Sequence, residues 1–462
     1  MVIILVFSGI TFLFYFLPLV LFCYFISPSK LKNLTLLIFS LIFYAWGEPI
    51  YIFIMLFSSV VDYTHAIIID KYRGSLKSKL ALISSIVVNL GLLGFFKYSD
   101  FLISISNNIF NTNLPLLNIT LPIGISFYTF QTMSYSIDVY RNEAPVQKNI
   151  ISLATYVTLF PQLVAGPIVR YADIAKDLNN RRSDFDKIYE GICRFIFGLS
   201  KKVIIANNLG VIWFSIKDMP YSSLSVGTAW LGIICFTLQI YFDFSGYSDM
   251  AIGLGKIFGF EFLENFNFPY ISKSITEFWR RWHMSLGIWF RDYVYIPLGG
   301  NRGSKSRWLF NIFVVWFLTG LWHGASFNFI LWGLYFGIIL ALEKLVVLNL
   351  LDKCPNFIRH IYTMLLVIIG FVLFDITELS GVFGYLGTMF NLDSVIFDKT
   401  FYYYLVPNLA LLIIAIVAST PVFKNILDKY QYIKFFALAF GLVVSTAFLV
   451  DSTFNPFLYF RF

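Results

Sequence analysis

The sequence predicts an all-α integral membrane protein, a polytopic helical bundle of about 10–12 membrane spans. Of the 462 residues, 58% are apolar and only 13% are charged, and the mean hydropathy is +0.75. A soluble domain carries about 25% charged residues, so this chain has too little polar surface to cover a globule in water. Aromatic residues make up 20% of the chain, which is typical of proteins with aromatic belts at the membrane interfaces. This composition excludes a disordered chain, a coiled coil, a disulfide scaffold and an ordinary cytosolic enzyme.

The spans are predicted from apolar runs, because a helix needs about 20 mostly apolar residues to cross a bilayer. No soluble domain, internal repeat or low-complexity linker interrupts the runs, so residues 1–462 are interpreted as a single membrane domain. Several runs are short or interrupted. The candidate spans are 2–27, 34–46, 49–69, 80–97, 120–139, 203–216, 228–252, 308–322, 326–350, 361–376, 404–420 and 435–451.

The basic loops assign the sides of the membrane, because loops rich in Lys and Arg stay in the cytoplasm. Two such loops, at 30–32 and 71–79, enclose one hairpin of apolar segments, which places the N-terminus outside. Carried forward, the same alternation places 254–306 in the cytoplasm, and the loop 377–403 and the tail 455–462 outside. The net charge of +8 is therefore interpreted as a topology signal and not as a surface for nucleic acid.

The apolar segment 150–168 breaks this alternation, because the charged stretches on both sides of it fall in the cytoplasm. It also contains Phe160-Pro161 and Gly166-Pro167, and proline interrupts helices. We therefore expect a re-entrant segment, which a membrane protein tolerates only where protein or a water-filled cavity surrounds it.

A strongly amphipathic helix is predicted over 274–293, lying at the cytoplasmic interface. Ile275, Phe278 and Trp282 recur at helical spacing on one face, whereas Arg280 and Arg281 lie on the other. His283 falls at the border of the apolar face. It is a candidate functional residue, with anchoring of the helix in the interface as the alternative.

His323 is the strongest candidate, because an ionisable residue at bilayer depth is costly and often functional. It lies in Gly320-Leu321-Trp322-His323-Gly324, between the apolar segments 308–321 and 326–350. Such a histidine suits a general base. It also suits a proton-coupled transporter, or a buried imidazole bonded to a backbone carbonyl. The residues alone leave these alternatives open.

Asp243 and Asp249 lie at the end of an apolar run, where carboxylates are costly unless they are hydrogen-bonded. They could orient a histidine, bind a cation or bridge helices. The four cysteines show no metal-ligand or disulfide spacing, so no metal site is predicted. The sequence also lacks a Walker A motif, HExxH and GxSxG, which argues against an NTPase, a zincin and an α/β-hydrolase.

The ordered set of motifs resembles the membrane-bound O-acyltransferase family. Trp322-His323-Gly324 and the upstream His283 carry the resemblance, together with four further strings. These strings resemble the bacterial branch that O-acetylates alginate and peptidoglycan, and they lie at 121–128, 165–167, 241–253 and 278–300. The resemblance extends from about residue 6 to Phe462.

The resemblance implies a bundle in which a cytoplasmic funnel for an acyl thioester meets an outer funnel for the acceptor. The family's essential histidine corresponds to His323, and its second position corresponds to His283. The implied reaction moves an acetyl group from acetyl-CoA to an acceptor hydroxyl, with no bound cofactor. Trp322 or Ser285 could donate a hydrogen bond to the oxyanion.

The resemblance also implies partners. Arg280 and Arg281 would lie where coenzyme A phosphates arrive, or would contact anionic membrane lipid. Asp243 and Asp249 are further candidates for contact with the thioester donor. An extracytoplasmic SGNH-type transferase would pass the acetyl group to a cell-envelope polysaccharide outside the bacterial cell membrane. The alternatives are D-alanyl transfer to teichoic acid from a carrier protein, and a proton-coupled transporter.

Overall fold

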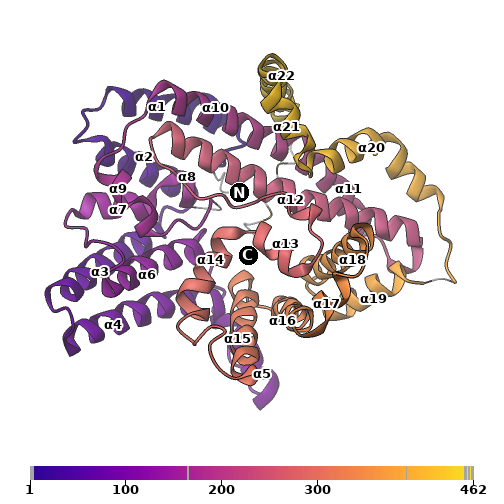
Figure 1. Cartoon of the computed structure of the whole chain (residues 1–462), viewed down its shortest axis with the longest axis horizontal. Coiled ribbons are helices and arrows are strands. Elements are labelled where there is room, and N and C mark those ends of the chain that lie inside the picture. The colour runs from indigo at the N-terminus through magenta and orange to yellow at the C-terminus, as the bar shows by residue number, and fades with distance from the viewer. Residues whose placement is uncertain (1–4, 164–165, 392, 452–454, 456–457, 459–462) are drawn as a thin grey trace. The chain divides into compact units, whose positions relative to one another are not determined.

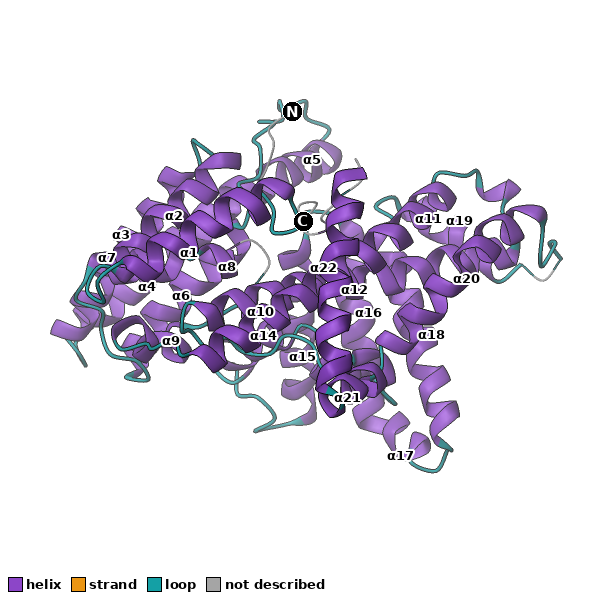
Figure 2. Ribbon diagram, turned by 90° about the horizontal axis from the view of Figure 1, so that it is seen from above, coloured by secondary structure: helices purple, strands orange, loops and turns teal. Residues whose placement is uncertain are grey.

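The computed structural model describes residues 5–163, 166–391, 393–451, 455 and 458. Within these residues all regular secondary structure is helical (Figure 2), which confirms the all-α prediction. The predictions on Ala165 and on most of the tail 455–462 fall outside the described residues.

Contacts within the chain divide it into two compact units, Met1–Gly198 with Tyr247–Leu263 and Leu199–Gly246 with Glu264–Phe462. The prediction of one domain over 1–462 stays a prediction. The first unit contains α1 (Leu17–Ile26), α2 (Lys32–Gly47), α3 (Ile52–Lys71), α4 (Leu76–Leu93), α5 (Ser99–Phe110), α6 (Ile125–Arg141), α7 (Ile150–Thr158), α8 (Phe160–Leu163), α9 (Tyr171–Asn179), most of α10 (Phe185–Ser200) and the end of α12 (Val226–Ile257). The second contains the rest of α12 with α11 (Asn207–Lys217), α13 (Ile275–Arg281), α14 (Met284–Phe290), α15 (Lys305–His323), α16 (Phe327–Leu342), α17 (Leu348–Leu351), α18 (Asn356–Asp375), α19 (Leu379–Met389), α20 (Lys399–Ala418), α21 (Pro421–Lys429) and α22 (Gln431–Asp451).

Eight helices of the described part are long and apolar enough to cross a membrane, and two shorter apolar helices accompany them. This confirms a polytopic helical membrane protein. The eight are Ile52–Lys71, Leu76–Phe110, Phe185–Lys217, Val226–Ile257, Phe327–Leu351, Asn356–Asp375, Lys399–Ala418 and Gln431–Asp451, and the shorter two are Phe12–Ile26 and Lys32–Gly47.

The predicted span at 120–139 corresponds to α6, which begins later than expected and is not among the apolar helices named above. Pro122 precedes it, and Gly124 adopts a left-handed conformation with φ 74° at its N-terminus. Nearly every residue of α6 is buried, and the helix packs with α3 and α4 (Figure 1).

The segment 150–168 contains no spanning helix in its described residues. It forms α7, of nine residues, and α8, of four, with a break at Leu159 before Pro161. At about 1.5 Å per residue, neither helix approaches the roughly 30 Å of a hydrocarbon core. The expectation that this segment does not cross as a helix is confirmed, whereas its dip into the membrane stays a prediction.

The single amphipathic helix predicted over 274–293 is wrong. The segment forms two short helices, α13 and α14, and His283 stands between them with φ 44° and ψ 52°. A left-handed residue ends a helix, since the next N–H can no longer follow the helical ladder. Trp282 and His283 are both buried, whereas Arg280 and Arg291 of the same segment are exposed. The position of this segment at the cytoplasmic interface stays a prediction.

Glu343 fixes the start of α13. Its carboxylate, fully buried, accepts hydrogen bonds from the backbone N–H of Ile275 at 2.6 Å and of Thr276 at 2.8 Å, and from the Thr276 hydroxyl at 2.7 Å. A carboxylate at a helix N-terminus satisfies N–H groups that lack a partner within the helix. These bonds connect the first turn of α13 to the residue that follows α16.

Glycines allow α15 and α16 to approach closely. A Cβ at Gly320 would lie 2.4 Å from the carbonyl oxygen of Phe329, and one at Gly333 would lie 2.3 Å from that of Trp316. Small residues at such crossings let helix backbones pack together in membranes. This contact sets the position of the end of α15, where His323 lies.

We expect Gly320→Ala to lower the unfolding free energy by about 1–3 kcal/mol, because the added methyl group meets backbone that cannot rotate away. Thermal unfolding in detergent measures the change. Gly387→Ala in α19 is the matched control, since its Cβ would meet no heavy atom within 4 Å. Equal melting temperatures for the two variants would contradict the close-packing argument.

Candidate functional site

His323 ends α15 inside a cage of aromatic rings. Its ring centroid lies 4.9 Å from Trp332, 5.0 Å from Trp322 and 5.2 Å from Phe374, and the residue is 5% exposed. A Cβ at Gly324 would lie 2.3 Å from the Phe329 ring, so only glycine leaves room for that ring beside the histidine. The glycine after the histidine therefore has a packing role.

His283 lies in the same unit and is 2% exposed. Its ring and that of Phe244 form a T-shaped pair with 4.7 Å between centroids. It stands outside the helices long enough to cross a membrane, and burial lowers the pKa of its imidazole to about 3. The imidazole is therefore neutral at pH 7. A left-handed backbone is strained for a non-glycine residue, and such strain is concentrated at functional sites.

Trp322 joins the two histidines. Its ring lies 5.0 Å from the ring of His323 and 5.8 Å from that of His283, between centroids. The structure thus brings together the two residues that the sequence singled out, although 40 positions separate them in the chain. The indole between them is one of the predicted oxyanion donors.

Asn265 organises the His283 side of the site. Its Oδ1 lies 3.0 Å from Nδ1 of His283 and accepts hydrogen bonds from the hydroxyl of Ser285 at 2.9 Å and its backbone N–H at 3.3 Å. Ser285, the other predicted donor, is therefore placed next to His283 by a shared partner. The sequence analysis did not identify Asn265.

The remaining predicted residues lie in other settings. Arg280 is exposed on α13, whereas Arg281 forms an ion pair with Glu277 at 3.0 Å. Asp249 belongs to the first unit, where it pairs with Arg194 at 2.8 Å. Their predicted contacts with the thioester donor stay predictions.

Asp243 forms a buried ion pair. Its Oδ1 lies 2.6 Å from Nζ of Lys202, and both side chains are 2% exposed. Its Oδ2 accepts a hydrogen bond from the backbone N–H of Leu458 at 3.0 Å, and Lys202 also donates to Asn207 at 2.9 Å. Bridging of helices was one of the three roles that the sequence allowed for Asp243, and these contacts agree with it.

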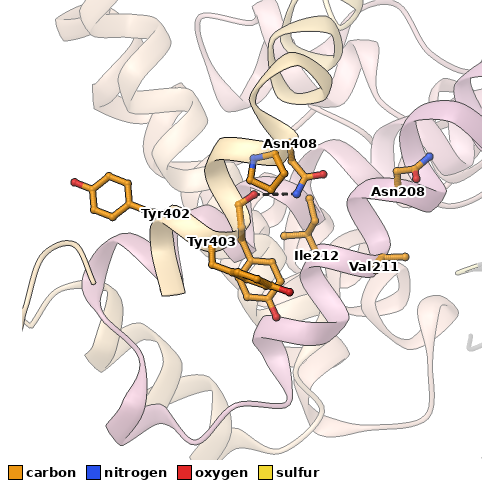
Figure 3. A pocket seen from close by; sticks show the side chains of 8 residues that line it. Asn208, Val211, Ile212, Tyr402, Tyr403 and Asn408 are labelled. Carbon is orange, nitrogen blue, oxygen red and sulfur yellow. Dashed lines mark hydrogen bonds between the residues drawn. The ribbon is translucent and has the colours of Figure 1, made fainter. Parts of the chain in front are cut away.

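The pockets among the described residues include two in the second unit. One of about 300 Å³ is lined by Phe329 and Phe374, which contact His323, and by polar residues that include Lys217, Asp375 and Glu378. It reaches the aromatic cage of the candidate site. The other, of about 520 Å³, lies between α11 and α20 (Figure 3) and is lined by Asn208, Val211, Ile212, Tyr402, Tyr403, Tyr404, Pro407 and Asn408. It includes none of the residues around the histidines.

Trp332 is a further residue that the sequence analysis missed. Its ring contacts His323, and within the described residues its buried Nε1–H has no hydrogen-bond partner. A tryptophan in an apolar helix gives no local signal of function, so only the packing identifies it. Among the same residues, no group of three or more His, Cys, Asp or Glu side chains is placed to hold a metal ion.

The chain belongs to the membrane-bound O-acyltransferase family, whose model matches residues 9–383. It is therefore an acyltransferase, as the motif resemblance implied. It is 45% identical to the probable alginate O-acetylase of Pseudomonas aeruginosa, over 84% of this chain and 75% of that protein.

Two further relatives differ in what they transfer. The chain is 37% identical to the peptidoglycan O-acetyltransferase of Helicobacter pylori, over 74% of this chain and 71% of that protein. It is 31% identical to the teichoic acid D-alanyltransferase of Bacillus subtilis, over 49% of this chain and 60% of that protein. The two O-acetylating relatives thus have a higher sequence identity to this chain and match a larger share of it.

Proposed function

We propose that this protein transfers an acetyl group from acetyl-CoA, supplied from the cytosol, to an acceptor hydroxyl for O-acetylation of an extracellular polysaccharide. The observation that carries the proposal is the contact of the Trp322 ring with both His323 and His283. The two relatives named for O-acetylation favour acetyl over D-alanyl as the group transferred.

His323 acts as the general base in this proposal. Its imidazole takes the proton of the acceptor hydroxyl while that oxygen forms a bond to the thioester carbonyl carbon. The tetrahedral intermediate then expels the thiolate as the carbon–sulfur bond breaks, and the imidazolium returns the proton to the sulfur. The products are an acetyl ester and a free thiol.

The intermediate carries a negative oxygen, and stabilising that charge is usually the largest catalytic contribution. The indole N–H of Trp332 beside His323 is a suitable donor. Trp322 is a further candidate, whereas the hydroxyl and the backbone N–H of Ser285 already donate to Asn265. Arg280 and Arg281 on α13 would hold the phosphates of the thioester donor or the headgroups of anionic lipid.

The setting of this reaction is part of the same proposal. The protein would lie in the cytoplasmic membrane of a bacterium with its N-terminus outside. An extracytoplasmic SGNH-type transferase would receive the acetyl group and pass it to peptidoglycan, an alginate-like chain or another cell-envelope polymer. A D-alanyl donor on a carrier protein is the alternative.

The choice of donor is tested with membranes that contain the protein. We expect ¹⁴C-acetyl-CoA alone to label material that mild alkali releases as acetate. D-alanyl carrier protein should label nothing above membranes without the chain. Labelling from the carrier protein only would replace the acetyl proposal with D-alanyl transfer.

A further inference from the structure

Asn265 is fully buried in the loop that precedes α13. Both its side chain and its backbone form hydrogen bonds with the residues at the break between α13 and α14. Its side-chain oxygen contacts His283 and Ser285, and its backbone carbonyl accepts the N–H of Met284 at 2.9 Å. Asn265 therefore contacts three consecutive residues at the point where the backbone turns left-handed.

The bonds to Ser285 identify the amide atom that faces His283. The backbone N–H of Ser285 can only donate, and it meets this atom at 3.3 Å. The atom is therefore the oxygen, which can only accept, so Nδ1 of His283 must carry the hydrogen of the 3.0 Å contact.

We propose that Asn265 is a positioning residue that holds His283 as the Nδ1–H tautomer, so that Nε2 offers a lone pair to the substrate. In a neutral imidazole one nitrogen donates and the other accepts. His283 then receives a hydrogen bond from an O–H or N–H group of a substrate and cannot polarise the thioester carbonyl by donating from Nε2. This inference rests on the proposed function, because it assigns a role to His283 in that reaction.

The tautomer itself is measured without any activity. With ¹⁵N-labelled histidine in the full-length protein, we expect the Nδ1 resonance of His283 at the protonated position and Nε2 at the unprotonated one at pH 7. His283→Gln identifies the signal by its loss. A protonated Nε2 in the wild-type protein would overturn the inference even if acetyl transfer is confirmed.

Two substitutions test the role of Asn265 in the reaction. Asn265→Leu removes the acceptor and should lower the rate about 10²-fold, because losing control of a histidine tautomer is costly. Asn265→Asp keeps an acceptor for the same three donors and should restore most of the rate. The new carboxylate beside Nδ1 also favours the protonated imidazole and so raises the pKa of His283. The rate should therefore begin to fall at a higher pH in Asn265→Asp than in the wild-type protein.

Asn311→Leu is the matched control, because Asn311 is a fully buried asparagine of the same unit that donates to the carbonyl of Gly300 at 2.9 Å. It should lower stability and leave the pH–rate profile in place. Equal rates and pH profiles for Asn265→Asp and Asn265→Leu would show that Asn265 has only a packing role. If wild-type membranes transfer no acetyl group, the proposed function fails, while the tautomer measurement still stands.

Discussion

Replacing His323 by glutamine is expected to lower acetyl transfer by about 10²–10⁴-fold, the usual contribution of a general base. Glutamine keeps a polar side chain of similar reach but cannot take a proton. The surrounding rings of Trp322, Trp332 and Phe374 should hold it without a large change in packing. Ester-linked acetate on extracellular polymer, released by mild alkali, measures the loss in cells.

The matched control is His360→Gln. His360 is a histidine of the same unit that lies on α18, and its Nδ1 is 3.3 Å from the carbonyl oxygen of Ser272. Both variants are compared at equal membrane expression and equal melting temperature in detergent. Wild-type acetate in a folded His323→Gln protein would contradict the assignment of His323 as the base, and a proton-linked transport assay would become the next experiment.

The second large effect concerns stability. Lys202→Met is expected to lower the unfolding free energy by about 3–5 kcal/mol, because it leaves the Asp243 carboxylate buried without its cation. The pair is separated by 2.6 Å and is almost completely enclosed. A charge in such a place is costly once its partner is removed, whereas replacing both partners is often close to neutral.

The double variant Lys202→Met/Asp243→Asn is therefore expected to recover part of the loss. Together with Lys202→Met, Asp243→Asn and the wild-type protein it forms a double-mutant cycle. Thermal unfolding in detergent gives the free energies. Additive effects of the two substitutions would contradict the ion pair as a coupled unit. The same variants address Asp243: a folded double variant with wild-type acetate transfer would show that its predicted contact with the thioester donor is wrong.

Local patterns in the sequence were sufficient for the class of fold. Apolar runs of membrane length predicted the helices, and the prolines of 150–168 predicted a break that α7 and α8 confirm. The same reasoning failed for 274–293. Its apolar positions recur at helical spacing, but periodicity does not reveal that His283 adopts a left-handed conformation. Contacts from Asn265 and Glu343 hold the two short helices there, and those contacts are not local.

The candidate site shows the same division. The sequence by itself determined that this is a helical membrane protein with two unusual histidines, since composition, apolar length and a short motif are properties of neighbouring residues. Only the tertiary structure decided that Trp322 contacts both histidines, that Asn265 sets the environment of His283 and that Asp243 pairs with Lys202. Hydrogen bonds and ion pairs of buried groups depend on which distant segments meet. Each buried polar group must find a partner wherever the fold supplies one.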